Sequence, residues 1–98
     1  MGKISYSEQA IADLEEIFGY TIETFGEAQA EKYKATLETG FHRIAGDPRL
    51  GRSIAGRTRT FSYYVCDRHT ILYSREDGGI FVVRILHVAM DFFRHLPE

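Results

Sequence analysis

The chain has 98 residues, a net charge of −2 and 44% hydrophobic residues, which suits one compact domain and leaves no room for two. No apolar stretch approaches the ~18 residues that a membrane span requires, and the N-terminus lacks the apolar core of a signal peptide, so we expect a cytoplasmic protein with no membrane contact. Cys66 is the single cysteine, which excludes an internal disulfide and a cysteine-rich zinc site.

The charge is unevenly distributed along the chain. Residues 1–48 hold four basic and nine acidic side chains, whereas residues 49–98 hold eight basic and five acidic ones. Every Lys or Arg after Lys34 is an arginine, the residue suited to bidentate pairing with carboxylate or phosphate. We therefore expect the second half to carry the contact surface. Direct nucleic-acid binding is not expected, because the net charge is negative and no basic stripe follows a helix.

The first half predicts a short strand followed by two helices. Residues 3–6 alternate as a strand does, and Ser7 is placed to cap a helix. Apolar residues then recur at three- and four-residue steps, as in an amphipathic helix: Ile11, Leu14, Ile17, Phe18, Ile22 and Phe25. Gly26 ends this helix, and a second stripe follows in Ala30, Tyr33, Leu37, Phe41 and Ile44. The short connection predicts an antiparallel helical hairpin.

The second half predicts a basic loop and then a sheet. The loop, expected to be mobile, runs from Arg49 to Arg57 without a sustained period. Three segments rich in β-branched and aromatic residues follow at hairpin spacing and predict an antiparallel meander: Arg59–Cys66, His69–Arg75 and Ile80–His87. Residues 89–96 are expected to form a short last turn. The fold class is therefore α+β in two layers, with the hairpin covering one sheet face and the other face left open.

One charged residue interrupts the apolar strand 81–87. Strand alternation places Val82 and Leu86 on one face with Arg84, and Phe81, Val83 and Ile85 on the opposite face. A guanidinium keeps its proton and is costly to bury unpaired. Arg84 therefore either pairs within the chain, with Asp91 as the candidate, or lies on a surface that a partner covers.

Motifs along the whole chain resemble those of a known family. They are Ala12–Ile17, Tyr20–Thr21, Phe25–Gly26, Gln29–Ala30, Asp47–Pro48, Gly51–Arg52, His69–Tyr73, Val83–His87 and Met90–Asp91. In this order and spacing, they resemble the ParE-type toxins of type II toxin–antitoxin systems, within the RelE/ParE superfamily. The resemblance covers residues 1–98 as one toxin domain and implies the RelE/ParE-like fold.

The resemblance implies a growth inhibitor that binds DNA gyrase, stabilises its cleaved-DNA state and is neutralised by a ParD-like antitoxin. Such an inhibitor acts by binding, so no catalytic residue, cofactor or metal is expected. We assign target binding to four arginines that lie within eleven positions: Arg49, Arg52, Arg57 and Arg59. The strand face with the lone cation is assigned to the antitoxin: Val82, Arg84 and Leu86.

Three other interpretations remain open. RelE-like relatives cut messenger RNA on the ribosome, and the groups that could do so here are Arg59, Arg84, His69, His87 and His95. However, no lysine follows Lys34 and no tyrosine follows Tyr73, so the basic cluster and C-terminal aromatic residue of those nucleases are missing. A metal site at His87, Asp91 and His95 has helical spacing, but His87 ends a strand pattern. The third interpretation is a binding module that has the same fold but no toxic activity.

An aromatic cluster in the strand segments has two interpretations. Its members are Phe61, Tyr63, Tyr64, Tyr73 and Phe81. Such residues can stack on nucleic-acid bases, but packing within a small sheet is the commoner reason for them. We therefore expect this cluster to belong to the core.

Overall fold

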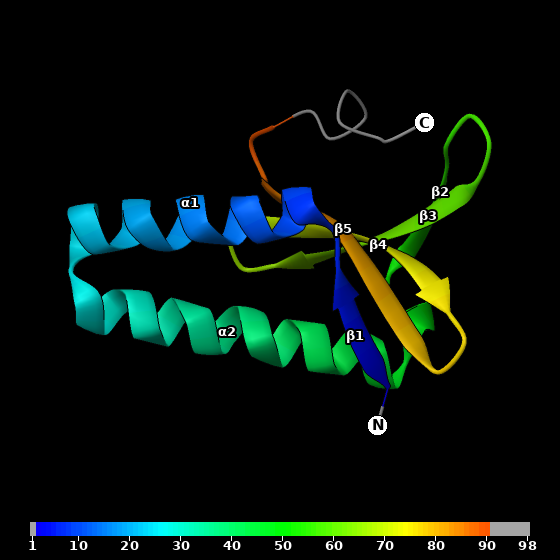
Figure 1. Ribbon diagram of the computed structural model, residues 1–98, viewed down its shortest axis with the longest axis horizontal. Helices are drawn as coiled ribbons and strands as arrows, with labels where there is room; N and C mark the ends of the chain where they lie inside the picture. Colours follow the sequence, from blue (N-terminus) through cyan, green and yellow to red (C-terminus); the bar gives the residue numbers. More distant parts are fainter. Residues whose placement is uncertain (1, 91–98) are drawn as a thin grey trace.

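The computed structural model describes residues 2–90 as a helical hairpin packed against a twisted sheet (Figure 1). The elements are β1 (Lys3–Tyr6), α1 (Glu8–Phe25), α2 (Glu27–Gly46), the short 3-10 helix η1 (Pro48–Leu50), β2 (Arg52–Ala55), β3 (Thr60–Cys66), β4 (His69–Glu76) and β5 (Gly79–His87). The predicted α+β class is confirmed. Of the last turn predicted over residues 89–96, only residues 89 and 90 are described, and the Met90 amide donates to the carbonyl of His87.

The ends of α1 follow from the local sequence. The Ser7 hydroxyl accepts a hydrogen bond from the Ala10 amide at 2.9 Å, which satisfies one of the free donors of the first turn. Gly26 has φ of 92°, a value that side chains disfavour, and its amide donates back to the Ile22 carbonyl. The chain can therefore reverse within one residue and begin α2 at Glu27, as predicted.

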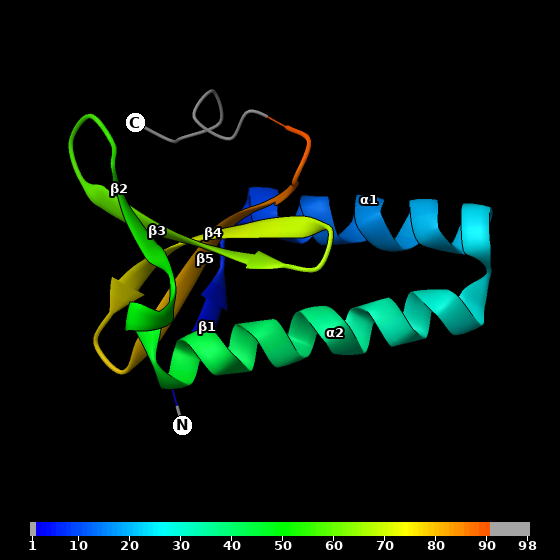
Figure 2. The same ribbon diagram turned by 180° about the vertical axis from the view of Figure 1, so that it is seen from behind.

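The sheet has five strands in the order β1-β5-β4-β3-β2. The predicted meander is present as β3, β4 and β5, joined by two-residue turns in which Asp67 and Gly78 have positive φ. Two further strands extend this meander into the full sheet. The strand β1 is parallel to β5, and β2 is antiparallel to β3. Figure 2 shows β2 and β3 on the side of the sheet away from β1.

The interpretation of residues 49–57 as a loop without secondary structure was wrong. Pro48–Leu50 forms a 3-10 turn and Arg52–Ala55 forms the edge strand β2. Its one apolar anchor is Ile54, which packs with Phe61, Leu72 and Val83 on the sheet. A four-residue strand with a single anchor has too little alternation to be recognised from sequence.

The main core lies between the hairpin and one face of the sheet. The helices contribute Ala10, Leu37, Phe41, Ile44 and Ala45 to it, and the strands contribute Cys66, Ile71, Tyr73, Ile80, Val82 and Ile85. A smaller cluster gathers Phe61, Leu72 and Val83. Successive residues Val82 and Val83 thus belong to different clusters, as residues on the two faces of a strand do. Both helices continue beyond the sheet, so the distal half of the hairpin projects from the body (Figure 1).

Candidate functional site

Arg84 on β5 is paired with Asp13 on α1. Its Nε donates to Asp13 Oδ2 at 2.8 Å and its Nη2 donates to Asp13 Oδ1 at 3.0 Å, so the pair is bidentate. This hydrogen bonding raises the pKa of Arg84 above its ordinary value and keeps the guanidinium charged. Only 19% of the Arg84 side chain is exposed. The cation therefore has its carboxylate within the described chain.

Asp13 also closes the free edge of β5. The parallel partner β1 ends at Tyr6, opposite Val82, so the edge of β5 beyond that point has no strand beside it. Ser7 binds there first, through its amide to the Val82 carbonyl and its hydroxyl to the Val83 carbonyl. The Asp13 carboxylate then accepts the Ile85 amide at 2.9 Å. The start of α1 thus satisfies the backbone groups that an edge strand leaves unpaired.

The expected open patch of Val82, Arg84 and Leu86 is wrong as a description of the surface. Val82 is 0% exposed and Leu86 is 2% exposed. A β-bulge explains the error for Val82: Leu72 pairs with Arg84 and the next residue Tyr73 pairs with Val82, so Val83 is extra on β5. Alternation changes phase there, and Val82 and Ile85 both join the main core. Binding of Arg84 to an antitoxin stays a prediction.

The internal partner of Arg84 was missed in the sequence. Asp91, the expected candidate, lies outside the described residues. Asp13 lies three residues after Ala10 and four before Ile17, on the same side of α1 as both. An acidic residue on an apolar stripe, together with one cation in an apolar strand, is the signal that could have found the pair.

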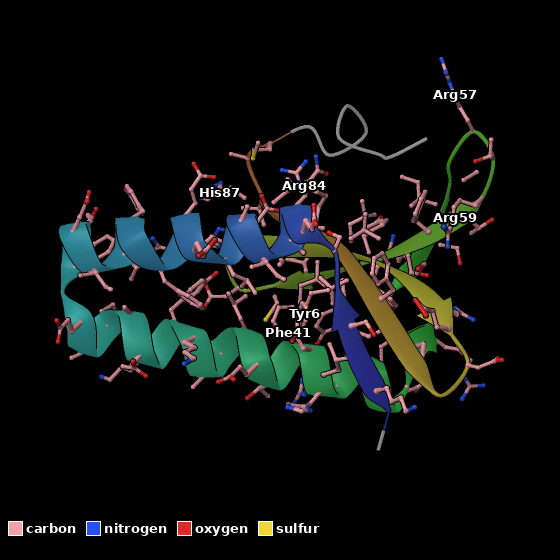
Figure 3. The ribbon with its side chains drawn as sticks, in the orientation of Figure 1. Tyr6, Phe41, Arg57, Arg59, Arg84 and His87 are labelled. Carbon is pink, nitrogen blue, oxygen red and sulfur yellow. The ribbon has the colours of Figure 1, made fainter. Side chains whose placement is uncertain are left out.

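The four arginines assigned to target binding are all exposed. Arg49 lies on η1 and pairs with Asp47 at 3.3 Å, Arg52 lies on β2, and the other two lie on the β2–β3 connection. Figure 3 shows Arg57 at the tip of that connection and pointing away from the body, with Arg59 nearer the sheet. The Arg59 guanidinium lies 5.3 Å from the centre of the Phe61 ring. We refer to residues 49–59 as the basic segment.

The start of the basic segment is held by a buried tyrosine. Tyr73 Oη donates to the Pro48 carbonyl at 2.7 Å and accepts the Gly51 amide at 3.0 Å. Burial raises the pKa of the Tyr73 phenol, which therefore keeps the proton that it donates. A Cβ on Gly51 would lie 2.2 Å from the same Oη, so only glycine fits. The segment expected to be mobile is thus tied to the core at this end.

A cavity of about 710 Å³ lies between the distal hairpin and the β3–β4 turn. Aromatic and imidazole side chains line much of it, including Tyr20, Phe25, Tyr33, His69 and His87. Tyr33 Oη lies 2.6 Å from His69 Nδ1, and the two imidazole rings meet edge to face with centroids 5.5 Å apart. Burial, and next the neighbouring His87, lower the pKa of His69 to about 4.

The groups considered for RNA cleavage do not form one constellation. His69 and His87 are neighbours, but Arg84 is engaged by Asp13, and Arg59 stacks on Phe61. Figure 3 shows Arg59 and His87 well apart along the molecule. His95 lies outside the described residues, as do Asp91 and His95 of the metal interpretation. Within residues 2–90, no group of three His, Cys, Asp or Glu side chains is placed to hold a metal ion.

The aromatic cluster belongs to the core rather than to one stacking platform. Phe61 and Tyr73 are buried, and they belong to different clusters. Tyr64 packs against the main core, whereas Tyr63 and Phe81 pack against the smaller one. In the part of the chain that the structure describes, neither helix has the length and apolar character needed to cross a bilayer.

A helical hairpin on a five-stranded sheet, with an exposed basic segment and a half-open cavity, defines a small α+β protein of the RelE/ParE kind. A family model described as the ParE toxin of the type II toxin–antitoxin system parDE matches residues 4–92. The chain belongs to this ParE toxin family.

Curated relatives and solved structures agree with this assignment. Toxin ParE1 of Mycobacterium tuberculosis (strain H37Rv) is 37% identical over 91 residues, covering 92% of this chain and 93% of that protein. Toxin ParE of Escherichia coli is 31% identical, with coverage of 92% and 88%. A solved structure described as a chromosomal ParDE TA system from P. aeruginosa has a TM-score of 0.74 at 16% identity, with coverage of 90% and 97%. A Helicobacter pylori protein has the same fold at a TM-score of 0.58 and 14% identity, covering 91% of this chain and 97% of that one.

Proposed function

We propose that this ParE-family toxin, acting in the cytoplasm as a single domain over residues 1–98, inhibits DNA gyrase by binding it. It is neutralised by a ParD-like antitoxin. Inhibition requires only that the toxin bind the cleaved-DNA state of gyrase more tightly than the resealed state, and each ~1.4 kcal/mol of preference shifts that ratio tenfold. The toxin performs no chemistry in this scheme.

The observation that carries the proposal is the family match over nearly the whole chain. The basic segment adds a physical candidate for target contact, since four exposed arginines follow one another from η1 to β3. Its anchor at Tyr73 lowers the entropy lost when the segment orders on a partner. Arginine at an interface pairs with carboxylates or phosphates, and the cleaved gyrase complex offers both.

The test applies two activity assays to charge-reversal variants. Wild type, Arg52→Glu/Arg57→Glu and Arg75→Glu are purified, and each is assayed for loss of gyrase supercoiling and for ribosome-dependent RNA cutting. Arg75 is an exposed arginine on β4 outside the basic segment, so it is the matched control. We expect wild type and Arg75→Glu to inhibit supercoiling, the double variant to lose inhibition, and all three to bind antitoxin equally.

Two results would contradict the proposal. RNA cutting by wild type with supercoiling intact would support the RelE-like nuclease instead. Full inhibition by the double variant would remove the basic segment from the target interface.

A further inference from the structure

The sheet ends at β2, which is paired along one side only. Among the described residues, β2 is the last strand in the order and has β3 as its one neighbour (Figure 2). At the other end of the sheet, β1 begins against the end of α2, where a Cβ on Gly2 would overlap the Ala45 carbonyl oxygen. An unpaired strand edge presents backbone donors and acceptors that another chain can bind. The free side of β2 lies within the basic segment.

One hydrogen bond fixes which backbone groups of β2 face away from the sheet. The Gly56 amide donates to the Arg59 carbonyl at 2.8 Å. Along an antiparallel pair, residues alternate between facing the partner strand and facing away from it. Ala55 is the next residue and Ser53 lies two further along, so the amides and carbonyls of both face away from β3. Both residues are exposed, and within residues 2–90 these outward groups have no hydrogen-bond partner.

The spacing of these outward groups fits an extended polypeptide. Two residues of a strand span about 7 Å, and over this length Ser53 and Ala55 offer amide donors and carbonyl acceptors in alternation. A second extended strand carries its own acceptors and donors at the same spacing. A nucleic-acid backbone presents phosphate oxygens, which cannot donate to the two carbonyls. The edge therefore favours a protein segment over nucleic acid.

The charge beside the edge favours an acidic segment. Residues 47–59 hold four basic side chains and one acidic one. The acidic residue, Asp47, pairs with Arg49. Arg52 is exposed on β2 itself. Because arginine pairs bidentately with carboxylates, Asp or Glu on an added strand would be attracted, and Lys or Arg would be repelled.

Both ends of β2 are fixed within the toxin. The Gly51 amide donates to Tyr73 Oη at 3.0 Å just before the strand, and the Gly56 amide bonds to Arg59 just after it. A strand already held in its bound conformation loses less entropy on binding. The cost of ordering therefore falls mainly on the partner.

We propose that β2 binds an extended acidic segment of gyrase as an added strand. The carbonyls of the segment accept from the Ser53 and Ala55 amides, its amides donate to the carbonyls of the same two residues, and its carboxylates pair with Arg52. This inference rests on the proposed function, because it takes gyrase to be the target, and it specifies how the target is bound.

The test measures the affinity of toxin variants for gyrase on DNA by surface plasmon resonance. Ser53→Pro removes one outward donor, and proline is tolerated where the amide of an edge strand faces solvent. We expect it to weaken binding about tenfold or more, because a carbonyl of the partner loses its donor. Ser53→Thr keeps the amide, and we expect it to bind at least about fivefold more tightly than Ser53→Pro. Arg52→Glu is expected to weaken binding about tenfold or more.

Hydrogen exchange separates a lost contact from a lost strand. Slow exchange at the Gly56 amide in Ser53→Pro is expected to show that the β2–β3 pairing is intact. In the wild type, the Ser53 and Ala55 amides are expected to exchange quickly in the free toxin and at least about tenfold more slowly in the gyrase complex.

Three results would overturn the inference. They are unchanged exchange of the Ser53 and Ala55 amides in the gyrase complex, equal gyrase affinities of wild type and Ser53→Pro, and equal wild-type affinities for gyrase on DNA and for the same DNA alone. The last result would identify nucleic acid as the occupant. Supercoiling inhibition by wild type in parallel would leave the proposed function standing after the first two results, whereas failure of wild type to bind gyrase would overturn both.

Discussion

Asp13 and Arg84 are 71 positions apart in the chain, and their side chains meet through two hydrogen bonds of 2.8 and 3.0 Å. The same carboxylate accepts the Ile85 amide, so one residue of α1 satisfies both a cation and a backbone donor of β5. Parallel pairing with β1 ends at Val82, before this point. Asp13 therefore stabilises the distal part of β5 as a strand would, and it fixes the hairpin to the sheet.

Replacing Asp13 by alanine is expected to lower the free energy of unfolding strongly. The change leaves Arg84 as a mostly buried cation without its partner and leaves the Ile85 amide unpaired. Removing one partner of such a pair costs roughly 3–5 kcal/mol. Urea unfolding followed by circular dichroism measures the loss.

Two further variants separate pairing from helix effects. Glu15→Ala changes an exposed carboxylate on the same helix and is expected to alter stability by less than ~0.5 kcal/mol. The double variant Asp13→Leu/Arg84→Leu removes both charges of the pair. It is expected to be more stable than the single variant Asp13→Leu, which leaves Arg84 unpaired. Equal losses in Asp13→Ala and Glu15→Ala would contradict the role of the pair.

Tyr73→Phe is expected to destabilise the fold and to release the start of the basic segment. The substitution removes one oxygen that serves the Pro48 carbonyl and the Gly51 amide at a fully buried position. Unsatisfied buried groups of this kind cost about 1–3 kcal/mol. Hydrogen exchange at the Gly51 amide is expected to become faster. Tyr64→Phe, at a half-buried tyrosine with no hydroxyl hydrogen bond among the described residues, is the control, and faster exchange in both variants would contradict the anchor.

The elements that sequence predicted well are those with local signals. Ser7 and Gly26 set the ends of α1 through contacts within a few residues, and Asp67 and Gly78 set the hairpin turns through their own backbone preferences. The edge strand β2 was missed although it pairs with the next strand, β3. Its four residues carry one apolar anchor, Ile54, which is too little alternation to indicate a strand.

The candidate site was harder to predict, for two physical reasons. The bulge on β5 depends on pairing with β4, and a shift of one residue moves every following side chain to the other face. That is why Val82, which packs in the main core, was placed on the same face as Arg84 and Leu86. The cavity beside His69 and His87 joins elements far apart in the chain, so only the fold brings those rings together.

The free energy of unfolding is expected to decrease as the pH is lowered, because of His69. The ring is buried against His87, while Asp67 and Asp13 oppose the shift only weakly, and the pKa of His69 is lowered from 6.5 to about 4. The unfolded chain therefore binds a proton below pH 6.5 that the folded chain binds only near pH 4. The free energy of unfolding therefore decreases as the pH falls from 6.5 to 4, by no more than about 1.4 kcal/mol per pH unit. Partial exposure of the His69 ring makes this decrease smaller.

His69→Gln isolates that contribution. Glutamine does not titrate, so the stability difference between wild type and variant is expected to shrink from neutral pH toward pH 4. Urea unfolding at several pH values measures it. His42→Gln changes an exposed histidine on α2 and is the control. A pH-independent difference between wild type and His69→Gln would show that His69 binds its proton equally in both states.

Replacing glycine by alanine is expected to have opposite effects on stability at two helical positions, Gly19 and Gly40. A Cβ on Gly19 in α1 would meet nothing within 4 Å, so Gly19→Ala is expected to stabilise by about 0.5–1 kcal/mol through helix propensity. A Cβ on Gly40 in α2 would lie 2.7 Å from Cys66 Sγ, in the main core. Gly40→Ala is therefore expected to destabilise by about 1–3 kcal/mol despite the better propensity, because the core is overfilled.

Cys66→Ala provides the compensating change for Gly40→Ala. Removing Sγ takes away the atom that the new Cβ would meet, so the double variant is expected to be more stable than the sum of the single effects. Burial raises the pKa of the Cys66 thiol, and we expect slow reaction with thiol reagents in the wild type and faster reaction where Gly40→Ala displaces the side chain. Thermal melts of the four proteins measure the first effect, and thiol titration of wild type and Gly40→Ala measures the second. Additive losses with unchanged thiol reactivity would mean that α2 shifts as a whole instead of pressing on Cys66.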